Sequence, residues 1–288
     1  MKKIIKKSSA CVAVFALLVS LFSVSFSATT YYYSHNYEFY KNDSSGLTIT
    51  QYQDTVDNLQ IPSELIDIKV NEIGPSAFAD RTDLLSVSMP DSIETISAFA
   101  FANCQNVENI KFSSNLSLSF TGAFQECSSL KSADMSMTKI TALSNQTFYK
   151  CTSLRNVVLP STCTTIKKYA LANCTQLENV FIPSSVTAIE ANAFKNSSAF
   201  TITGYFGSYA EEYANANNIP FKGISTYDIG DVNMDGKVDI LDATLVQKYV
   251  ANIVDLSAEQ KYLADYNNDG DITVVDATEI QKFIVHLN

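Results

Sequence analysis

The feature that most constrains the fold is a repeat of about 23 residues that runs through the middle of the chain. Aligned on one large apolar position, its copies place there Phe78, Phe101, Phe124, Phe148, Leu171 and Phe194. The steps between successive copies are 23, 23, 24, 23 and 23 residues. A near-constant period of this size is typical of a solenoid, in which each turn buries an apolar face against the next one. The sequence therefore predicts a coil of stacked turns.

Each copy ends in a short alternating run that a proline closes. Val157 and Leu159 precede Pro160, and the same pattern recurs in the next copy before Pro183. Such runs predict short strands of a parallel sheet, with proline ending each strand because it cannot donate to the ladder. The third copy departs from the pattern, since "SSNLSLSF" and "SADMSMTKI" contain no proline. Its register is therefore the least constrained.

Four cysteines occupy one position of consecutive copies, namely Cys104, Cys127, Cys151 and Cys174. Stacked cysteines at strand spacing are compatible with a metal site, with disulfides or with simple packing. Packing is favoured because Arg81 and Ser197 hold the equivalent position in the outer copies. Thiols are also among the most buried side chains. The sequence predicts buried free thiols here, and also at Cys163, which takes the place of an aliphatic residue.

These copies resemble the BspA-like subclass of leucine-rich repeats, over about residues 37–222. The resemblance includes "GLTITQYQDTVDNLQIP", which is similar to the family's N-terminal capping hairpin. It also includes "GYFGSYAEEYANANNIPF", which is similar to its terminal unit with a small amphipathic helix, where Tyr209 and Tyr213 would form the inner face. The resemblance implies an α/β solenoid with short parallel strands and capping elements, and a binding surface instead of a catalyst.

A second feature is a doubled acidic loop near the C-terminus. Oxygen-bearing residues fall at positions 1, 3, 5, 9 and 12 of a loop that begins at Asp231, and the loop recurs 34 residues later from Asp265. Gly236 and Gly270 hold position 6, where a calcium loop turns sharply, and hard oxygen ligands suit a hard cation. We therefore predict two Ca²⁺ ions and folding coupled to calcium, because so many close carboxylates would otherwise repel one another. The predicted ligands are Asp231, Asn233, Asp235, Asp239 and Asp242 with the Lys237 carbonyl, and Asp265, Asn267, Asp269, Asp271, Thr273 and Asp276.

The two loop-helix copies, "DGKVDILDATLVQKYV" and "DGDITVVDATEIQKFIV", resemble a type I dockerin over residues 229–287. Each loop lacks an entering helix of ordinary length. The resemblance implies a small all-α calcium-binding domain of paired EF-hand-like loop-helix units, with Phe283 among the core residues of the helices. It also implies docking to a cohesin domain on a scaffoldin, as in a cellulosome.

The cohesin contacts that the resemblance implies lie at loop positions 10 and 11 and further along each helix. They are Ile240, Leu241, Gln247, Lys248 and Asn252 in the first copy, and Val274, Val275, Gln281, Lys282 and His286 in the second. Many dockerins carry Ser-Thr at positions 10 and 11, whereas this chain has apolar pairs, which indicates a drier contact. The alternative is that one member of each pair belongs to the core. Because the copies are so alike, we expect that either helix can face the cohesin.

The N-terminus reads as an export signal. "MKKIIKK" precedes an uncharged apolar run that ends in small residues near Ser27, which predicts a cleaved signal peptide; an uncleaved membrane anchor is the alternative. The predicted segments are a signal peptide at 1–27, the repeat domain at 28–222, a linker at 223–228 and the dockerin at 229–288. After cleavage 16 basic and 30 acidic residues remain, a net charge of −14, which excludes nucleic acid as a natural partner. The sequence therefore predicts a secreted, extracellular protein that does not insert into a membrane after cleavage.

Catalytic groups are sparse. The chain has only two histidines, in different predicted domains, so no histidine can activate a nucleophile within the repeats. Carboxylate pairs remain conceivable near Glu94, Glu178 and Glu190, although a solvated face is favoured. The tyrosines between Tyr31 and Tyr40 either bind a ligand or pack on the N-terminal cap. We predict a non-catalytic protein whose repeats recognise an unknown protein or glycan; the alternative is a dockerin-bearing enzyme of polysaccharide degradation, a hydrolase or lyase, with an unrecognised active site on the repeats.

Overall fold

The structure is a computed structural model that describes residues 5–8, 30–197 and 199–285. Most of the expected signal peptide lies outside these ranges, as does His286. The chain forms two compact units, Met1–Phe200 and Thr201–Asn288. Within the described ranges, no helix has the length and apolar character needed to cross a membrane.

The first unit starts with antiparallel strands. They are β1 (Ile5–Ser8), β2 (Thr30–Ser34), β3 (Tyr37–Lys41) and β4 (Leu47–Tyr52), paired in that order. The expected capping hairpin within residues 46–62 is wrong, because this segment supplies β4 and β5 (Asn58–Gln60), which lie in different sheets. The cap is instead formed by β2, β3 and β4. Here the tyrosines mostly pack against one another, as in the contacts Tyr31 with Tyr40 and Tyr37 with Tyr52.

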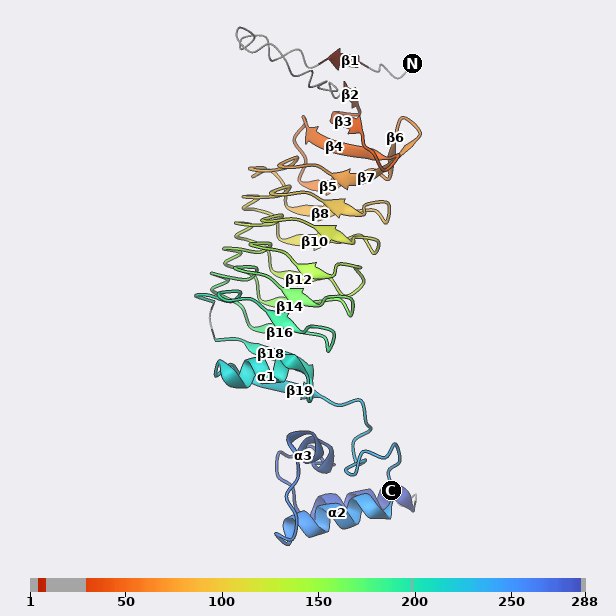
Figure 1. The fold of residues 1–288 in the computed structure, drawn as a ribbon, viewed down its shortest axis with the longest axis vertical. Helices are drawn as coiled ribbons and strands as arrows, with labels where there is room; N and C mark the ends of the chain where they lie inside the picture. Colours follow the sequence, from red (N-terminus) through yellow and green to blue (C-terminus); the bar gives the residue numbers. More distant parts are fainter. Residues whose placement is uncertain (1–4, 9–29, 198, 286–288) are drawn as a thin grey trace, which may run out of the picture. The chain divides into compact units, whose positions relative to one another are not determined.

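The solenoid is built from two ladders of short strands (Figure 1). The longer strands stack in parallel as β5, β8 (Ser86–Ser88) and β10 (Asn109–Lys111), and then as β12 (Ser132–Asp134), β14 (Asn156–Val158) and β16 (Asn179–Phe181). These are the predicted strands.

The second ladder was not predicted. It runs from β7 (Ile68–Ile73), which also pairs with β6 (Glu64–Leu65), to β9 (Thr95–Ile96) and β11 (Leu118–Ser119), and resumes with β13 (Ala142–Leu143), β15 (Thr165–Ile166) and β17 (Ala188–Ile189). Most of its strands are two residues long, too short to show alternation of polar and apolar residues.

We number the six turns by their aligned large residues, from Phe78 in the first turn to Phe194 in the sixth. Successive phenylalanine rings stack inside the coil, with centroid distances of 5.0 Å from Phe78 to Phe101, 5.4 Å from Phe101 to Phe124 and 5.7 Å from Phe124 to Phe148. The third turn is therefore in the predicted register. The stacked rings and the aliphatic residues around them form the core of this unit.

Two residues of each turn adopt the left-handed backbone conformation, two positions before and two positions after the aligned large residue. The later position has φ between 57° and 62° and holds Asp80, Asn103, Glu126, Lys150, Asn173 and Asn196. Four of these six are Asp or Asn, the residues that tolerate this conformation best after glycine. Asp and Asn at a fixed place in the repeat therefore mark its tight corner.

The predicted free, buried thiols are confirmed. Each thiol of the Cys104 to Cys174 ladder donates a hydrogen bond to the carbonyl of the aligned phenylalanine one turn earlier, with Sγ–O distances of 3.0 to 3.2 Å. The hydroxyl of Ser197 donates in the same way to Leu171, at 2.6 Å. Burial raises the pKa of Cys174 to about 12. These thiols thus act as buried hydrogen-bond donors.

Each ladder is interrupted once, and the two gaps lie on opposite sides of the third turn. The sheet of the longer strands stops at β10, which follows Phe101, and a new sheet begins at β12, which follows Phe124; the second ladder stops at β11, just before Phe124, and resumes at β13, just before Phe148. The step from the third to the fourth turn is 24 residues instead of 23, because of one extra residue. The hydroxyl of Ser144 donates to the Ser119 carbonyl across the junction. The turn without proline thus lies beside a gap in strand pairing.

The second unit contains a small capping element and a helical region. The capping element consists of the parallel strands β18 (Thr201–Tyr205) and β19 (Phe221–Ile224) with helix α1 (Tyr209–Ala216) between them. Its buried helical residues are Ala210 and Ala214, so the expected inner face of Tyr209 and Tyr213 is only partly formed.

The helical region consists of α2 (Ile240–Val250), α3 (Ala258–Ala264) and α4 (Val274–Ile284). Its core is formed by Val232, Ala243, Val246, Leu256, Ala264, Ala277 and Ile280. Val238 and Ile272 are partly buried and pack against this core. The assignment of Phe283 to the core is wrong: its side chain is 53% exposed and contacts only the edge of the region, at the Tyr266 ring.

Candidate metal loops and docking face

The first acidic loop is folded around its first and last aspartates. The carboxylate of Asp231 accepts hydrogen bonds from the backbone N–H groups of Asp235, at 3.1 Å, and Gly236, at 2.9 Å. Gly236 has φ of 89°, which only glycine adopts readily. The carboxylate of Asp242 accepts from the N–H groups of Asn233, at 2.9 Å, and Asp239, at 2.8 Å. Positions 1 and 12 therefore hold the loop closed from its two ends.

The second loop repeats this arrangement almost bond for bond. The Asp265 carboxylate accepts from the N–H groups of Asp269 and Gly270, each at 3.0 Å. The Asp276 carboxylate accepts from Asn267, at 3.3 Å, and from Thr273, at 2.9 Å. The two copies thus share one geometry as well as one sequence pattern.

The last positions of each loop also begin a helix. Asp239 and Thr273, at position 9, are the N-cap residues of α2 and α4, and Asp242 and Asp276 complete a capping box at the third helical position. An aspartate at position 12 is therefore short enough to bond back to the N-cap N–H while facing the loop. The same two residues set the start of the helix and the closing side of the loop.

The loops have the burial and charge expected of a cation site. Asp231 is 1% exposed, and Asp242 and Asp276 are fully buried. Burial raises the pKa of Asp242, and the charges of Asp231 and Asp239 raise it further, although backbone N–H groups act in the opposite direction. A cation bound among these oxygens would remove this cost.

The donor set defines which cation fits. Among the described residues, no three His, Cys, Asp or Glu side chains converge on one point. A cation here would therefore also need the amide oxygens of Asn233 and Asn267 and the main-chain carbonyls at position 7, from Lys237 and Asp271. A set made only of oxygens suits a hard cation such as Ca²⁺ and not a softer metal such as zinc or copper. The residues present fit the predicted calcium site.

Helix α3 enters the second loop, since Asp265 is its C-cap residue. This helix has only seven residues, which agrees with the expectation that the loop lacks an entering helix of ordinary length. A signal was present in the sequence: Ser257 and Gln260 form a capping box, with each side chain bonded to the other's backbone N–H. Gln260 also donates to the Val232 carbonyl, at 3.1 Å, and so ties α3 to the first loop.

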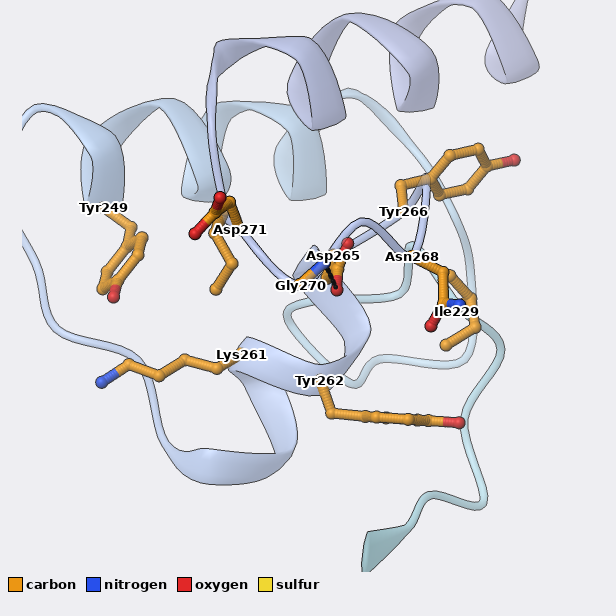
Figure 2. A pocket seen from close by; sticks show the side chains of 10 residues that line it. Ile229, Tyr249, Lys261, Tyr262, Asp265, Tyr266, Asn268, Gly270 and Asp271 are labelled. Atoms are coloured by element: carbon orange, nitrogen blue, oxygen red, sulfur yellow. Dashed lines mark hydrogen bonds between the residues drawn. The ribbon is translucent and has the colours of Figure 1, made fainter. Parts of the chain in front are cut away.

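A depression of about 650 Å³ lies beside the second loop, and the sequence did not indicate it. Figure 2 shows the hydrogen bond from Gly270 to Asp265 with the rings of Tyr249, Tyr262 and Tyr266 around it. Lys261 places its ammonium 5.4 Å from the Tyr249 ring centroid and pairs with Asp255 at 3.0 Å. The contact between Tyr249 and Lys261 joins the C-terminal end of α2 to α3.

The apolar pairs at loop positions 10 and 11 are on the surface. Their exposed fractions are 54% for Ile240, 59% for Leu241, 59% for Val274 and 50% for Val275. The alternative that one member of each pair belongs to the core is therefore wrong. Exposed apolar residues at the starts of two helices are unusual on a protein surface unless they contact a partner.

The other predicted contact residues are also accessible. Gln247, Lys248, Asn252 and Lys282 are exposed, and Gln281 is half-buried. Helices α2 and α4 pack together, and Ile240 at the start of α2 shares a shallow depression with Gln281 and Lys282 near the end of α4. We call the surface formed by these residues and the two apolar pairs the docking face.

Two protein families match the chain. Residues 71–201 match the BspA type leucine rich repeat region, in six copies, and residues 229–285 match the dockerin type I domain. No match is found among curated proteins.

Several solved structures resemble the repeat region. A leucine rich cell surface protein from Faecalibacterium prausnitzii is 27% identical, with a TM-score of 0.47 over 60% of this chain, and the match spans about half of that protein, 54%. The T. pallidum leucine rich repeat protein is 20% identical, with a TM-score of 0.50, over 66% of this chain and 97% of its own. The pneumococcal vaccine antigen PcpA is 19% identical, with a TM-score of 0.52, over 62% of this chain and 50% of its own.

The last two similarities support the fold alone. Type I dockerins bind calcium and cohesins, and dockerins and BspA-type repeats are extracellular or cell-surface modules. The chain therefore consists of a BspA-type leucine-rich repeat solenoid followed by a type I dockerin.

Proposed function

We propose that this protein is a secreted, non-catalytic binding protein that docks to a cohesin through its C-terminal helices and presents its repeats to another ligand. The observation that carries the proposal is the pair of matched acidic loops, each followed at once by an exposed apolar pair on a helix. Each loop buries its position-12 aspartate, Asp242 or Asp276, and the helix that follows exposes its first two apolar residues. These apolar residues are therefore accessible to a partner protein.

Two calcium ions would be held by the loop oxygens. In each loop these are the side chains at positions 1, 3, 5, 9 and 12 and the carbonyl at position 7. Bound Ca²⁺ would supply positive charge to the buried carboxylates of Asp231, Asp242 and Asp276, which form no ion pair with a basic side chain of the described residues. The side chains of Asp242 and Asp276 complete the capping boxes of α2 and α4. They thereby set where each helix begins and which way its first exposed residues point.

Docking in two orientations follows from the match between the copies. Each helix begins with an exposed apolar pair and carries a Gln-Lys pair about two turns later. The partner surface is expected to be apolar where it meets positions 10 and 11, because charged or strongly polar groups would be desolvated there without partners.

The repeats offer support for a non-catalytic role. The carboxylates considered above take part in contacts between turns: Glu94 pairs with Lys69, Glu178 pairs with Arg155, and Glu190 accepts a hydrogen bond from the Lys168 N–H. Contacts of this kind join neighbouring turns of the coil, which is a structural use of these carboxylates. Polysaccharide binding or protein binding by the repeats is compatible with these contacts.

The test is binding of the full mature chain to a panel of immobilised cohesins, with calcium and with EDTA. We expect at least one cohesin to be bound with calcium and released by EDTA, with about two ions taken up per chain in calorimetry. Binding that persists in EDTA, or no calcium uptake, would contradict the docking proposal. Release of reducing sugar from plant polysaccharides by the same preparation would contradict the non-catalytic part.

A further inference from the structure

The solenoid has an uneven charge distribution. Residues 127–177 contain six basic residues and one acidic residue, whereas residues 28–126 contain four basic and thirteen acidic residues. The fourth and fifth turns therefore carry positive charge within a strongly acidic protein. Such separation favours partners that carry negative charge where they meet these turns.

Tyrosines and lysines are combined on one corner of these two turns. The rings of Tyr149 and Tyr169 meet edge to face, with centroids 6.5 Å apart. Lys150 lies 5.4 Å from the Tyr149 centroid, and Lys168 lies 5.2 Å from the Tyr169 centroid. Lys150 pairs with Glu126 at 3.3 Å. Within the described residues no carboxylate forms an ion pair with the ammonium group of Lys167 or Lys168, and Glu190 bonds to the Lys168 backbone N–H instead. Two ammonium groups on this corner thus remain available to an external carboxylate.

On the second and third turns, the same corner carries exposed apolar side chains. Phe99, Leu118 and Phe120 are exposed by 38%, 52% and 47%. They belong to adjacent turns, because Phe120 N–H donates to the Ile96 carbonyl and Phe99 N–H donates to the Thr121 carbonyl, each at 3.0 Å. We call this apolar group, together with Tyr149, Tyr169, Lys167 and Lys168, the corner surface.

The repeat pattern does not call for an aromatic residue at the positions of Phe99 and Tyr169. Phe99 and Tyr169 occupy the left-handed position two residues before the aligned large residue, each with φ of 59°. Other turns place Ser76, Gly122 and Asn192 there. A bulky residue is disfavoured in this conformation, so it is expected to persist only where its side chain serves another purpose.

We propose that the corner surface binds an extended segment of a partner protein in which apolar side chains adjoin a run of carboxylates. Leu118 and the two phenylalanines match apolar side chains, and Lys167 and Lys168 match the carboxylates. The surface extends over the second to fifth turns, about 14 Å at strand spacing, which an extended segment of about five residues spans. A glycan fits less well, because aliphatic Leu118 offers no stacking face and the chain's own lysines lie over both tyrosine rings.

This inference rests on the proposed role of the repeats as a recognition region, and it names the partner class. The probe is a fluorescein-labelled peptide of about twelve residues, with leucine and phenylalanine followed by a run of glutamates. Binding to the full mature chain is measured by fluorescence anisotropy. We expect binding that weakens at least about tenfold when the glutamates are replaced by glutamines, and that weakens as salt is added.

Variants locate the site. The double variant Lys167→Glu/Lys168→Glu and the double variant Leu118→Ser/Phe120→Ser are each expected to weaken binding about tenfold. The matched control is Lys111→Glu, an exposed lysine of β10 on the other ladder, which should leave binding unchanged. Circular dichroism shows whether each variant keeps the fold of the parent.

Three results would overturn the proposal. One is no preference for the acidic peptide, and another is equal weakening by Lys111→Glu. The third is displacement of the peptide by polygalacturonate at equal or lower concentration, which would assign the surface to a glycan. EDTA, which should abolish cohesin docking, is expected to leave peptide binding intact, so failure of one proposal is distinguishable from failure of the other.

Discussion

Single residues at loop position 12 combine three tasks. Asp242 accepts two backbone N–H bonds, completes the capping box of α2 and is a predicted calcium ligand. We expect Asp242→Ala to lower calcium affinity by about a hundredfold, because a ligand and the closing contacts are lost together. Isothermal titration calorimetry measures the change.

The matched control is Asp271→Ala. Asp271 holds position 7, where the predicted ligand is the main-chain carbonyl, and its side chain is exposed. Calcium affinity should change little in this variant. A loss as large as that of Asp242→Ala would refute the predicted ligand assignment.

The cysteine ladder gives a second prediction for single residues. Cys151→Ala removes the thiol donor to the Phe124 carbonyl, which then keeps only the long bond of 3.4 Å from the Cys127 N–H, and this should destabilise the protein by about 1 kcal/mol. Cys151→Ser should cost less, since Ser197 already makes the equivalent bond through a hydroxyl. Denaturant unfolding measures both, and equal losses would show that packing alone matters at this position.

Burial of the thiols also predicts a dependence on pH. Because the pKa of Cys174 rises from 9.0 to about 12, the unfolded chain ionises this group first. The free energy of unfolding should therefore be unaffected by this thiol below pH 9 and should fall as the pH rises from about 9 towards 12. Cys174→Ser should show a shallower fall over this range; an unchanged slope would contradict the assignment.

At the scale of elements, the two docking helices are expected to substitute for each other. Leu241→Asp and Val275→Asp each place a charge on one helix only. We expect each single variant to bind cohesin within about threefold of the parent, whereas the double variant loses at least about a hundredfold. Surface plasmon resonance with one cohesin makes the comparison. Abolition of binding by either single variant would show that a single orientation is used.

The sequence predicted some elements better than others for physical reasons. The strands near Val157 and Val180 were predicted because three or more alternating residues precede a proline. The second ladder was missed, because strands of two residues such as β15 are stabilised by the neighbouring turn and not by their own pattern. Phe283 was wrongly placed in the core because a helix of 11 residues buries one apolar stripe, here through Ala277 and Ile280, and Phe283 lies outside it.

The loops were the most predictable part of the site, and the corner surface the least. Ligand spacing is local in sequence, so the spacing alone assigns Asp231 and Asp242 to their loop positions. Phe99 and Tyr169 lie 70 residues apart and share a face only because several turns stack between them. Such surfaces depend on how the turns of the coil stack, which residue spacing alone does not reveal.

For the whole molecule, we expect calcium removal to act on one region only. The helices beyond residue 229 depend on buried carboxylates, whereas the repeats are stabilised by apolar stacking and strand ladders. EDTA should therefore remove helical circular dichroism signal and leave the strand signal of the solenoid unchanged. An unchanged spectrum would refute the coupling of folding to calcium.

The interrupted strand pairing between Ser119 and Ala142 has a consequence for how the repeats come apart. In a linear array, cooperativity passes only between neighbours. The contact between the third and fourth turns has the widest of the three phenylalanine spacings, 5.7 Å, and keeps only one of its two ladders, through β12 and β14. Backbone amides of the first three turns and the last three should then exchange with solvent deuterium as two separate blocks. The solenoid would then open first at the junction between its third and fourth turns and unfold as two blocks of three turns each.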